Sequence, residues 1–254
     1  MPIAYCSIVG SVEVGDTWRH DESRIDMTTK RLNVAVLGSG RMGQHVTCVL
    51  EESADCRVAG IWCRDKPESL ADLLESADVA IDFTLPDASD VIVRSAVAAS
   101  TPLVCGVTGL DAKAMAALSN AARQIPLLYD RNMSIGIAVM TDLIRRTSAA
   151  LGSDFSVEIL ETHHIHKQDA PSGTAIALQN AIAKRPATIE SQREGDVIGN
   201  HRVRFVSSKE TLEIEHDVTD REVFADGAVN AARWLIHQPI GLYDMTDIAA
   251  HTQG

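Results

Sequence analysis

The chain has 254 residues, 45% of them hydrophobic and only 4% aromatic, which allows an aliphatic core in one large or two modest domains. Its 23 basic and 35 acidic residues give a net charge of −12, which argues against nucleic-acid binding and requires local positive groups to hold any anionic ligand. No apolar run approaches the roughly 18 residues of a membrane span.

The beginning of the chain does not resemble a targeting segment. Residues 1–26 lack a basic stretch followed by an apolar core, and they carry several acidic side chains. Met27 has the context of an ordinary start, so we expect residues 1–30 to be a poorly ordered extension that comes from an alternative start codon or an added tail. The five cysteines are odd in number and form no C-x-x-C pair, which indicates free thiols in a reducing compartment and a cytoplasmic location.

Short apolar runs alternate with helical patterns over the first half of the chain. They predict strands at 32–37, 56–62, 79–83, 102–105 and 126–129, and helices at 41–52, 67–75, 87–99 and 111–123. Pro67 lies near the first turn of the second helix, and Asp87 is placed to cap the third. This alternation predicts βαβ units and a doubly wound parallel sheet. We assign residues 31–132, with 239–254 returning, to an α/β dinucleotide-binding domain.

The pattern changes after residue 132. A long helix is predicted at 134–151, a strand at 156–161, a helix at 172–184 and a loop at 188–200. Alternating apolar residues then predict two antiparallel strands around 202–205 and 212–217. A last major helix follows, with Phe224, Ala228, Ala231 and Leu235 on its inner face. We assign residues 133–238 to an α+β domain with an open mixed sheet.

A glycine-rich loop joins the first predicted strand to the first predicted helix. Residues 38–43 match G-x-G-x-x-G in the context that favours dinucleotide binding. Gly38 allows the tight turn, Gly40 lets a pyrophosphate approach the backbone, and Gly43 allows close packing of the helix. The helix N-terminus supplies N–H groups for the phosphates. We therefore expect cofactor contacts at Gly38, Ser39, Gly40, Arg41, Met42 and Gly43.

The end of the second predicted strand bears on the choice between NADH and NADPH. An acidic residue there would accept hydrogen bonds from the ribose hydroxyls, whereas an arginine favours a 2′-phosphate. The chain has Cys63 and Arg64 at this point, with Asp65 one or two residues late. This favours NADPH, with Arg64 on the phosphate; the alternative is that Arg64 is a solvated surface residue.

The segment 158–174 holds the densest cluster of chemically active side chains. Three histidines and a lysine fall within the five positions from His163 to Lys167, and a helix start at Ser172 follows. Ser172 is a suitable N-cap, and the N–H groups of Gly173 and Thr174 are free to bind a carboxylate. No acidic or cysteine residues with metal spacing accompany the histidines, so we expect no metal. His163 and His164 are expected to point to opposite faces.

These residues resemble the 4-hydroxy-tetrahydrodipicolinate reductase (dihydrodipicolinate reductase) family. The family motif E-x-x-E-x-H-H-x-x-K-x-D-A-P-S-G-T-A matches residues 158–175 throughout, and the resemblance covers about residues 31–250. Shorter matches occur at 40–43, 81–84, 106–109, 132–136, 224–228 and 241–245.

The resemblance implies an enzyme that reduces 4-hydroxy-tetrahydrodipicolinate, by way of dihydrodipicolinate, to tetrahydrodipicolinate with NADPH or NADH, in diaminopimelate and lysine biosynthesis. Hydride would reach C4 of a cyclic dicarboxylate, His163 would be the proton donor and acceptor, and Lys167 the second proton donor. The family forms homotetramers through the sheet of its second domain, and its motif makes no demand at His166. The implied substrate contacts are His164, Ser172, Gly173 and Thr174, and the further cofactor contacts are Gly106, Val107, Thr108, Asp130, Arg131, Asn132 and Met133.

The chain departs from the family pattern at three places. Its glycine loop is one residue shorter than is common, Cys63 replaces an acidic residue, and the segment 185–201 is shorter than in many members, which bears on the oligomer interface. Two other functions compete with the reductase. Another two-domain NADP-dependent dehydrogenase would share the glycine loop but not the whole histidine–lysine segment. A non-catalytic NADP-binding redox sensor would keep residues 38–43 but tolerate loss of Lys167.

Overall fold

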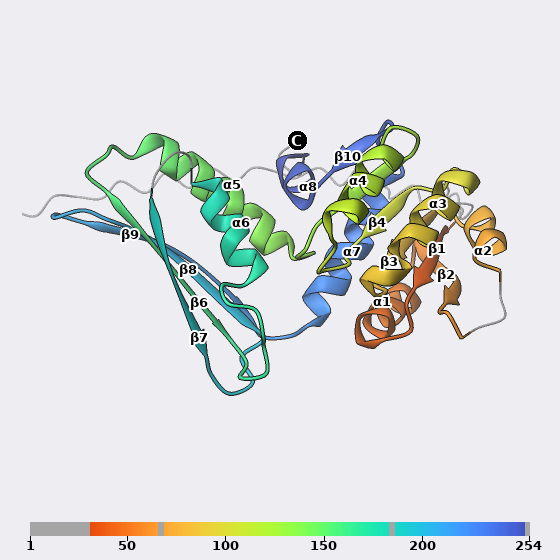
Figure 1. Ribbon diagram of the computed structural model, residues 1–254, viewed down its shortest axis with the longest axis horizontal. Helices are drawn as coiled ribbons and strands as arrows, with labels where there is room; N and C mark the ends of the chain where they lie inside the picture. Colours follow the sequence, from red (N-terminus) through yellow and green to blue (C-terminus); the bar gives the residue numbers. More distant parts are fainter. Residues whose placement is uncertain (1–30, 66–68, 183–185, 252–254) are drawn as a thin grey trace, which may run out of the picture. The chain divides into compact units, whose positions relative to one another are not determined.

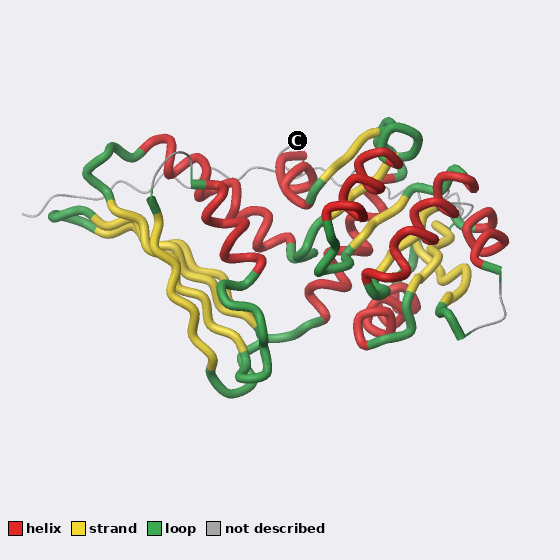
Figure 2. Tube along the Cα trace, in the orientation of Figure 1, coloured by secondary structure: helices red, strands yellow, loops and turns green. Residues whose placement is uncertain are grey.

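Two β-sheets organise the chain, as Figure 1 and Figure 2 show. The computed structural model describes residues 31–65, 69–182 and 186–251. The predicted extension 1–30 and Pro67 lie outside these ranges. The six strands of the larger sheet run in the order β10-β5-β4-β3-β1-β2, and every pairing is parallel. They are β1 (Leu32–Leu37), β2 (Cys56–Trp62), β3 (Val79–Asp82), β4 (Leu103–Cys105), β5 (Pro126–Tyr129) and β10 (Gly241–Tyr243).

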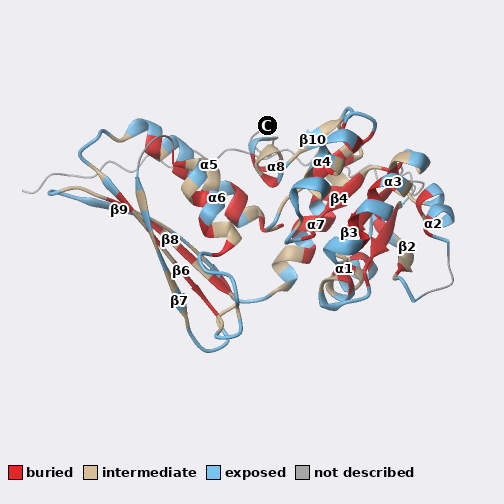
Figure 3. Ribbon diagram, viewed as in Figure 1, coloured by how far each residue is buried: buried red, intermediate tan, exposed pale blue. Residues whose placement is uncertain are grey.

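Helices cover both faces of the six-stranded sheet. Strand β1 shows why: its side chains alternate, so that Val34 and Val36 enter one apolar core while Ala35 and Leu37 enter another. The first core also contains buried residues of α1 (Arg41–Glu52), α7 (Glu222–Leu235) and α8 (Met245–His251). The second contains residues of α2 (Leu70–Ser76), α3 (Ser89–Ala99) and α4 (Ala112–Ala121). The predicted doubly wound fold is confirmed, and Figure 3 shows buried residues along its strands.

Three helices begin at side-chain caps to which the sequence analysis assigned no role. Ser69, Asp111 and Ser134 each accept a hydrogen bond from a first-turn N–H of α2, α4 and α5 (Ile135–Ala150). The prediction for Asp87 is wrong, because a short 3₁₀ segment, η1 (Pro86–Ala88), precedes α3 and the side chain makes no cap. Asp87 instead forms an ion pair with Arg64 on the surface.

The second sheet has four strands in the order β7-β6-β8-β9. Strand β7 is parallel to β6, while β8 is antiparallel to β6 and to β9, which confirms the open mixed sheet. The predicted loop at 188–200 is wrong over much of its length, since it contains β7. This edge strand is polar and alternates between half-buried and exposed residues, so its sequence carries no apolar period. The strands are β6 (Ser156–His163), β7 (Ala187–Arg193), β8 (Gly199–Val206) and β9 (Thr211–Val218).

Helices α5 and α6 (Gly173–Ala181) pack on one face of this sheet. Phe205 of the sheet is fully buried in the core that these helices and the sheet share. The other face carries a charged ladder, in which Arg204 pairs with Glu158 at 2.8 Å and with Glu213 at 3.2 Å. One face of the sheet is therefore apolar and covered, and the other is charged.

Helix α7 packs where its sequence pattern alone could not place it. The pattern put it with residues 133–238, but its buried side chains lie in the core of the six-stranded sheet. Gly227 permits this, because a Cβ there would lie 1.7 Å from the carbonyl oxygen of Met133. From Arg31 onward the chain forms one compact unit, so the domain division 31–132 and 133–238 stays a prediction. Within the described ranges no helix has the length and apolarity needed to cross a membrane.

Candidate active site

Most residues that the sequence singled out meet in one cavity of about 500 Å³. It lies at the carboxyl ends of strands β3 and β4, the start of α1 and the end of β6, which is the region where open parallel sheets bind ligands. Its lining includes the sequence-predicted residues Gly40, Arg41, Met42, Gly106, Val107, Thr108, Arg131, Asn132, Met133, His163, His164, Lys167 and Thr174.

The glycine loop opens helix α1 onto this cavity. Gly38 has a φ of 110°, a conformation that favours glycine, and Gly40 is the N-cap without any side-chain hydrogen bond to the first turn. A Cβ on Gly40 would meet no atom within 4 Å. A Cβ on Gly43 would lie 1.9 Å from the carbonyl oxygen of Gly38, so Gly43 serves the packing of the helix on its own loop. The first turn thus offers uncapped N–H groups beside an open space.

Neighbouring strand ends complete this side of the cavity. Phe83, Thr84 and Leu85 follow β3 and line it, although the sequence analysis gave them no role. Asp82 fixes their turn by accepting hydrogen bonds from the Thr84 N–H at 2.8 Å and the Thr84 hydroxyl at 2.7 Å. A Cβ on Gly106 would lie 2.3 Å from the Phe83 ring, so the glycine allows the ring its position.

The turn after β5 connects the two halves of the cavity. Asn132 donates to the Thr174 hydroxyl at 3.1 Å and accepts from the Ser134 N–H at 2.9 Å. Asp130 does not line the cavity; its carboxylate accepts from the backbone N–H groups of Asn132 and Met245, and burial raises its pKa. Asp130 therefore supports this turn from behind.

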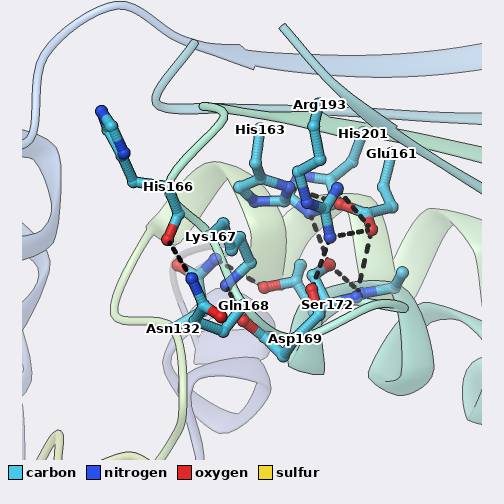
Figure 4. A network of polar contacts seen from close by, with 12 residues as sticks. Asn132, Glu161, His163, His166, Lys167, Gln168, Asp169, Ser172, Arg193 and His201 are labelled. Atoms are coloured by element: carbon cyan, nitrogen blue, oxygen red, sulfur yellow. Dashed lines mark hydrogen bonds and ion pairs between the residues drawn. The ribbon is translucent and has the colours of Figure 1, made fainter. Parts of the chain in front are cut away.

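His163 ends strand β6 and is held by a buried acid. Its Nδ1 makes a short hydrogen bond with Glu161, which is fully buried. Burial lowers the pKa of His163 below its ordinary value, and the Glu161 charge offsets only part of that effect. For Glu161, burial acts to raise the pKa, but hydrogen bonds from Ser191 and Arg193 and the nearby His163 bring it below its usual range. Figure 4 shows these side chains directed toward Ser172 at the start of α6.

His164 lines the same cavity as His163, contrary to the expectation of opposite faces. The alternation of a strand applies only as far as β6 extends, and β6 ends at His163. Burial lowers the pKa of His164, and the charge of Arg221 adds to this. His166 is exposed and lies outside the cavity lining, in agreement with the motif.

A carboxylate of the protein itself contacts two of the residues that were expected to bind an anion (Lys167, Gly173 and Thr174, with Ser172 as N-cap). Lys167 Nζ lies 2.8 Å from the Asp169 carboxylate, which also accepts the Gly173 N–H. Ser172 is buried; its hydroxyl accepts from the Ala175 N–H at 3.1 Å, and its own N–H donates to Glu161. Ser172 therefore shapes the helix start and does not line the cavity.

Positive charge is concentrated in the cavity, against the net charge of the chain. Arg41, Arg131, Lys167 and Arg221 line it, and no aspartate or glutamate among the described residues does so. A cavity lined by charges of one sign, with low-dielectric walls, attracts ligands of the opposite charge. No group of three or more His, Cys, Asp or Glu side chains in the described ranges could hold a metal ion.

Sequence reasoning missed Glu161, Arg193 and Arg221. Glu161 stands within the motif, three positions after Glu158, and that spacing was the available signal for it. Arg193 reaches the site only because β7 pairs with β6, with Arg193 opposite His163. Arg221 is a single arginine before α7 and carries no sequence signal. Arg64, predicted as a phosphate contact, is exposed and paired with Asp87 outside the cavity lining.

Comparisons with known proteins agree with this geometry. The family model described as "Dihydrodipicolinate reductase, N-terminus" matches residues 32–133, and "Dihydrodipicolinate reductase, C-terminus" matches 136–249. The 4-hydroxy-tetrahydrodipicolinate reductase of Xanthomonas euvesicatoria pv. vesicatoria is 40% identical over 237 residues, which cover 87% of this chain and 99% of the relative. That of Campylobacter lari is 36% identical over 240 residues, which cover 85% and 98%.

Two solved structures show the fold. A dipicolinate-bound dihydrodipicolinate reductase from Paenisporosarcina sp. TG-14 has a TM-score of 0.73 at 23% identity, covering 86% of this chain and 99% of that one. A C. glutamicum DAP dehydrogenase in complex with DAP has a TM-score of 0.53 at 12% identity, covering 86% and 94%. Since the two family models span both halves of the chain and the curated relatives match over nearly their whole length, this chain belongs to the dihydrodipicolinate reductase family.

Proposed function

We propose that the protein reduces 4-hydroxy-tetrahydrodipicolinate to tetrahydrodipicolinate with a nicotinamide nucleotide, in the diaminopimelate route to lysine. The relatives that carry this activity in their names match over almost their full length. The observation that carries the proposal is the shared cavity. The glycine loop of the six-stranded sheet lines it together with His163 at the end of β6 and Lys167 in the following loop.

The start of helix α1 fits the phosphates of a dinucleotide. Its first turn has no side-chain cap and no acidic residue, and Gly40 leaves the approach to the backbone open. Arg41 adds a positive charge at the same end. When bound, the nucleotide supplies the hydride. Residues 38–43, 106–108 and 131–133 would hold it, with Asp130 supporting the last of these turns.

We assign NADPH as the preferred nucleotide, with Arg64 on its 2′-phosphate. Arg64 follows β2, the strand whose end meets the ribose in this fold class. Its pairing with the exposed Asp87 leaves the guanidinium on the surface, where a phosphate could replace that weak partner.

The anion site suits one carboxylate of a cyclic dicarboxylate. Lys167 Nζ and the Gly173 N–H already hold a carboxylate, that of Asp169, so the geometry for this group is in place. Thr174 and His164 extend the site into the cavity, where Arg221 adds a further positive charge. A substrate carboxylate would take the position of Asp169, which is more than half exposed and can move toward solvent.

His163 is placed to supply a proton to the reduced ring. The 4-hydroxy compound would first lose water to give dihydrodipicolinate, an α,β-unsaturated cyclic imine. Addition of hydride at C4 of this imine moves the electron pair toward C3 and the ring nitrogen, and an acid must protonate the product. Glu161 holds Nδ1, so Nε2 is the nitrogen left for the substrate. A substrate with two carboxylates favours the imidazolium and offsets the effect of burial on the pKa of His163. Lys167 stabilises negative charge that develops nearby.

We also propose a homotetramer that assembles through the charged face of the four-stranded sheet. Its ladder of Arg204, Glu158 and Glu213 could pair with a second copy, and strand β7 gives the sheet a free edge within the described ranges. Sedimentation at several protein concentrations tests this assembly independently of activity.

The activity itself is tested by incubating the protein with NADPH and enzymatically generated 4-hydroxy-tetrahydrodipicolinate while absorbance at the nicotinamide band is followed. Oxidation of NADPH that requires this substrate supports the proposal. The two competing functions predict other results: a different dehydrogenase would be inactive here but turn over an amino acid or sugar acid, and a redox sensor would bind NADPH without any turnover.

A further inference from the structure

We propose that Glu161, itself held by Arg193, is the positioning residue of His163: it fixes the imidazole with Nε2 toward the cavity and favours the protonated ring. The inference rests on the proposed role of His163 as the proton donor. Glu161 does not line the cavity, so it would act through His163 and not on the substrate.

Both oxygens of Glu161 are used, as Figure 4 shows. Oε2 accepts from His163 Nδ1, while Oε1 accepts from the Ser172 N–H at 3.2 Å and from both terminal nitrogens of Arg193 at 3.1 Å. A fully buried carboxylate is costly unless it is paired and hydrogen-bonded. This degree of pairing keeps Glu161 ionised and oriented at the end of β6.

The orientation of His163 follows from this contact. A carboxylate only accepts hydrogen bonds, so Nδ1 carries the proton and Nε2 is either a lone pair or the second N–H of the imidazolium. The ring lies edge to face with His201, with centroids 5.1 Å apart. Gly199 lies beside Nε2, where a Cβ would come within 3.2 Å of this nitrogen, so glycine avoids a close contact with the ring. His163 is therefore confined on three sides, and Nε2 is the nitrogen that can serve the cavity.

The charges around His163 oppose its protonation except for Glu161. Lys167 from the following loop and Arg193 from β7 lower the pKa of His163, as burial does most strongly. From β8, His201 is neutral because burial lowers its pKa to about 3, and His216 on β9 faces His201. Among the largest effects on the pKa of His163, only those of Glu161 raise it.

Strand β7 brings the supporting residues to this point. Ser191 stands opposite Glu161 in the parallel pairing, and Arg193 stands opposite His163. Arg193 also donates to the Asp169 carbonyl oxygen, so the same guanidinium ties the acid to the loop that carries Lys167. Glu161 could use these same bonds only to hold the loop, so the experiment must distinguish that structural role from an effect on His163.

The central variant is Glu161→Gln, which keeps the shape but removes the charge. We expect kcat to fall by at least about tenfold, since an amide partner can also favour the wrong tautomer of the imidazole. The limb of the kcat–pH profile on which activity falls as pH rises should move to lower pH by about one unit or more, because Arg193 and Lys167 then act on His163 unopposed. KM and NADPH affinity should stay within about twofold. Glu161→Asp, which restores the charge, should recover the pH profile in part.

The matched control is Glu75→Gln, the same substitution at an exposed position of α2, outside the cavity lining and outside the charged face of the four-stranded sheet. It should leave kcat and the pH profile unchanged. In a His163→Gln background, Glu161→Gln should cause no further loss, because the residue it acts through is gone. Thermal unfolding of each variant reports whether it folds. If Glu161→Gln does not fold, histidine ¹⁵N chemical shifts of the wild-type protein and of Arg193→Lys report the tautomer and the titration of His163 instead.

Two results would overturn the proposal. One is a folded Glu161→Gln protein with wild-type kcat and pH profile beside an inactive His163→Gln protein, in which case His163 works without Glu161. The other is an additional loss in the His163→Gln background, which would mean that Glu161 acts only by holding the loop. A fully active His163→Gln protein would instead refute the role proposed for His163 itself.

Discussion

Alanine at Gly43 and alanine at Gly40 should harm the protein in different ways, although both glycines belong to one loop. A Cβ at Gly43 would lie 1.9 Å from the Gly38 carbonyl oxygen, whereas real Cβ contacts stay beyond 3.0 Å, so the start of α1 must move by about 1.1 Å. Such overpacking costs about 1–3 kcal/mol. For a chain of this size, about 2 kcal/mol corresponds to a fall of about 4–8 °C in the unfolding midpoint.

Gly40→Ala should leave the fold intact. Its backbone has φ −73° and ψ −172°, which alanine adopts freely, and the added methyl meets nothing within 4 Å. Loss of a good N-cap and reduced freedom of the unfolded chain act in opposite directions, so stability should change by less than about 1 kcal/mol. The methyl would occupy the approach to the α1 backbone, and we expect the Kd for NADPH to rise at least tenfold, about 1.4 kcal/mol.

Thermal unfolding followed by circular dichroism and NADPH titration followed by fluorescence measure both effects on the same samples. Gly43→Ala should lose stability, and Gly40→Ala should lose affinity at unchanged stability. Wild-type NADPH affinity in Gly40→Ala would refute the placement of the pyrophosphate over this glycine. A Gly43→Ala protein as stable as wild type would refute the close contact between the helix and its loop.

Three further outcomes are expected. Arg64→Ala should weaken the binding of NADPH but not that of NADH, whereas Asp87→Ala, which releases Arg64, should not weaken NADPH binding. Titration with both nucleotides measures these affinities, and wild-type NADPH affinity in Arg64→Ala would rule out Arg64 as the phosphate contact. Asp169→Asn should lower KM by up to about fivefold, because the variant loses a carboxylate that competes with that of the substrate; this change corresponds to about 1 kcal/mol, the strength of an exposed ion pair. An unchanged or raised KM in steady-state kinetics would show that Asp169 does not compete. Burial lowers the pKa of His201 from 6.5 to about 3 in the folded protein, so as pH falls below about 6.5 the unfolded chain binds a proton at His201 before the folded protein does, and the free energy of unfolding should decrease. Urea unfolding of His201→Gln should show a smaller decrease over the same pH range. An equal decrease in the variant and the wild-type protein would contradict this.

The larger sheet was predictable because its strands are short apolar runs between helical patterns. Buried strands such as β1 and β3 need side chains that suit both cores, and that requirement is visible in the sequence. Strand β7 was not predictable in this way, because a polar edge strand owes its place to backbone pairing with β6. The apolar face of helix α7 was visible in the sequence, but the pattern does not determine the sheet on which the helix packs.

The same distinction applies to the site. His163, Lys167 and Thr174 are close in sequence, so their motif announced them together. Glu161 and Arg193 are 32 positions apart, and their bond exists only because β7 lies beside β6. The neutral state of His201 likewise depends on burial that a sequence does not display.

The most direct measurement of the central claim is the turnover of His163→Gln with NADPH and enzymatically generated 4-hydroxy-tetrahydrodipicolinate. Loss of the proton donor should reduce kcat by about 10²–10⁴-fold. Affinity for NADPH should remain that of the wild-type protein, because the proposed nucleotide contacts at residues 38–43, 106–108 and 131–133 do not include His163. Turnover close to the wild-type value would contradict the account.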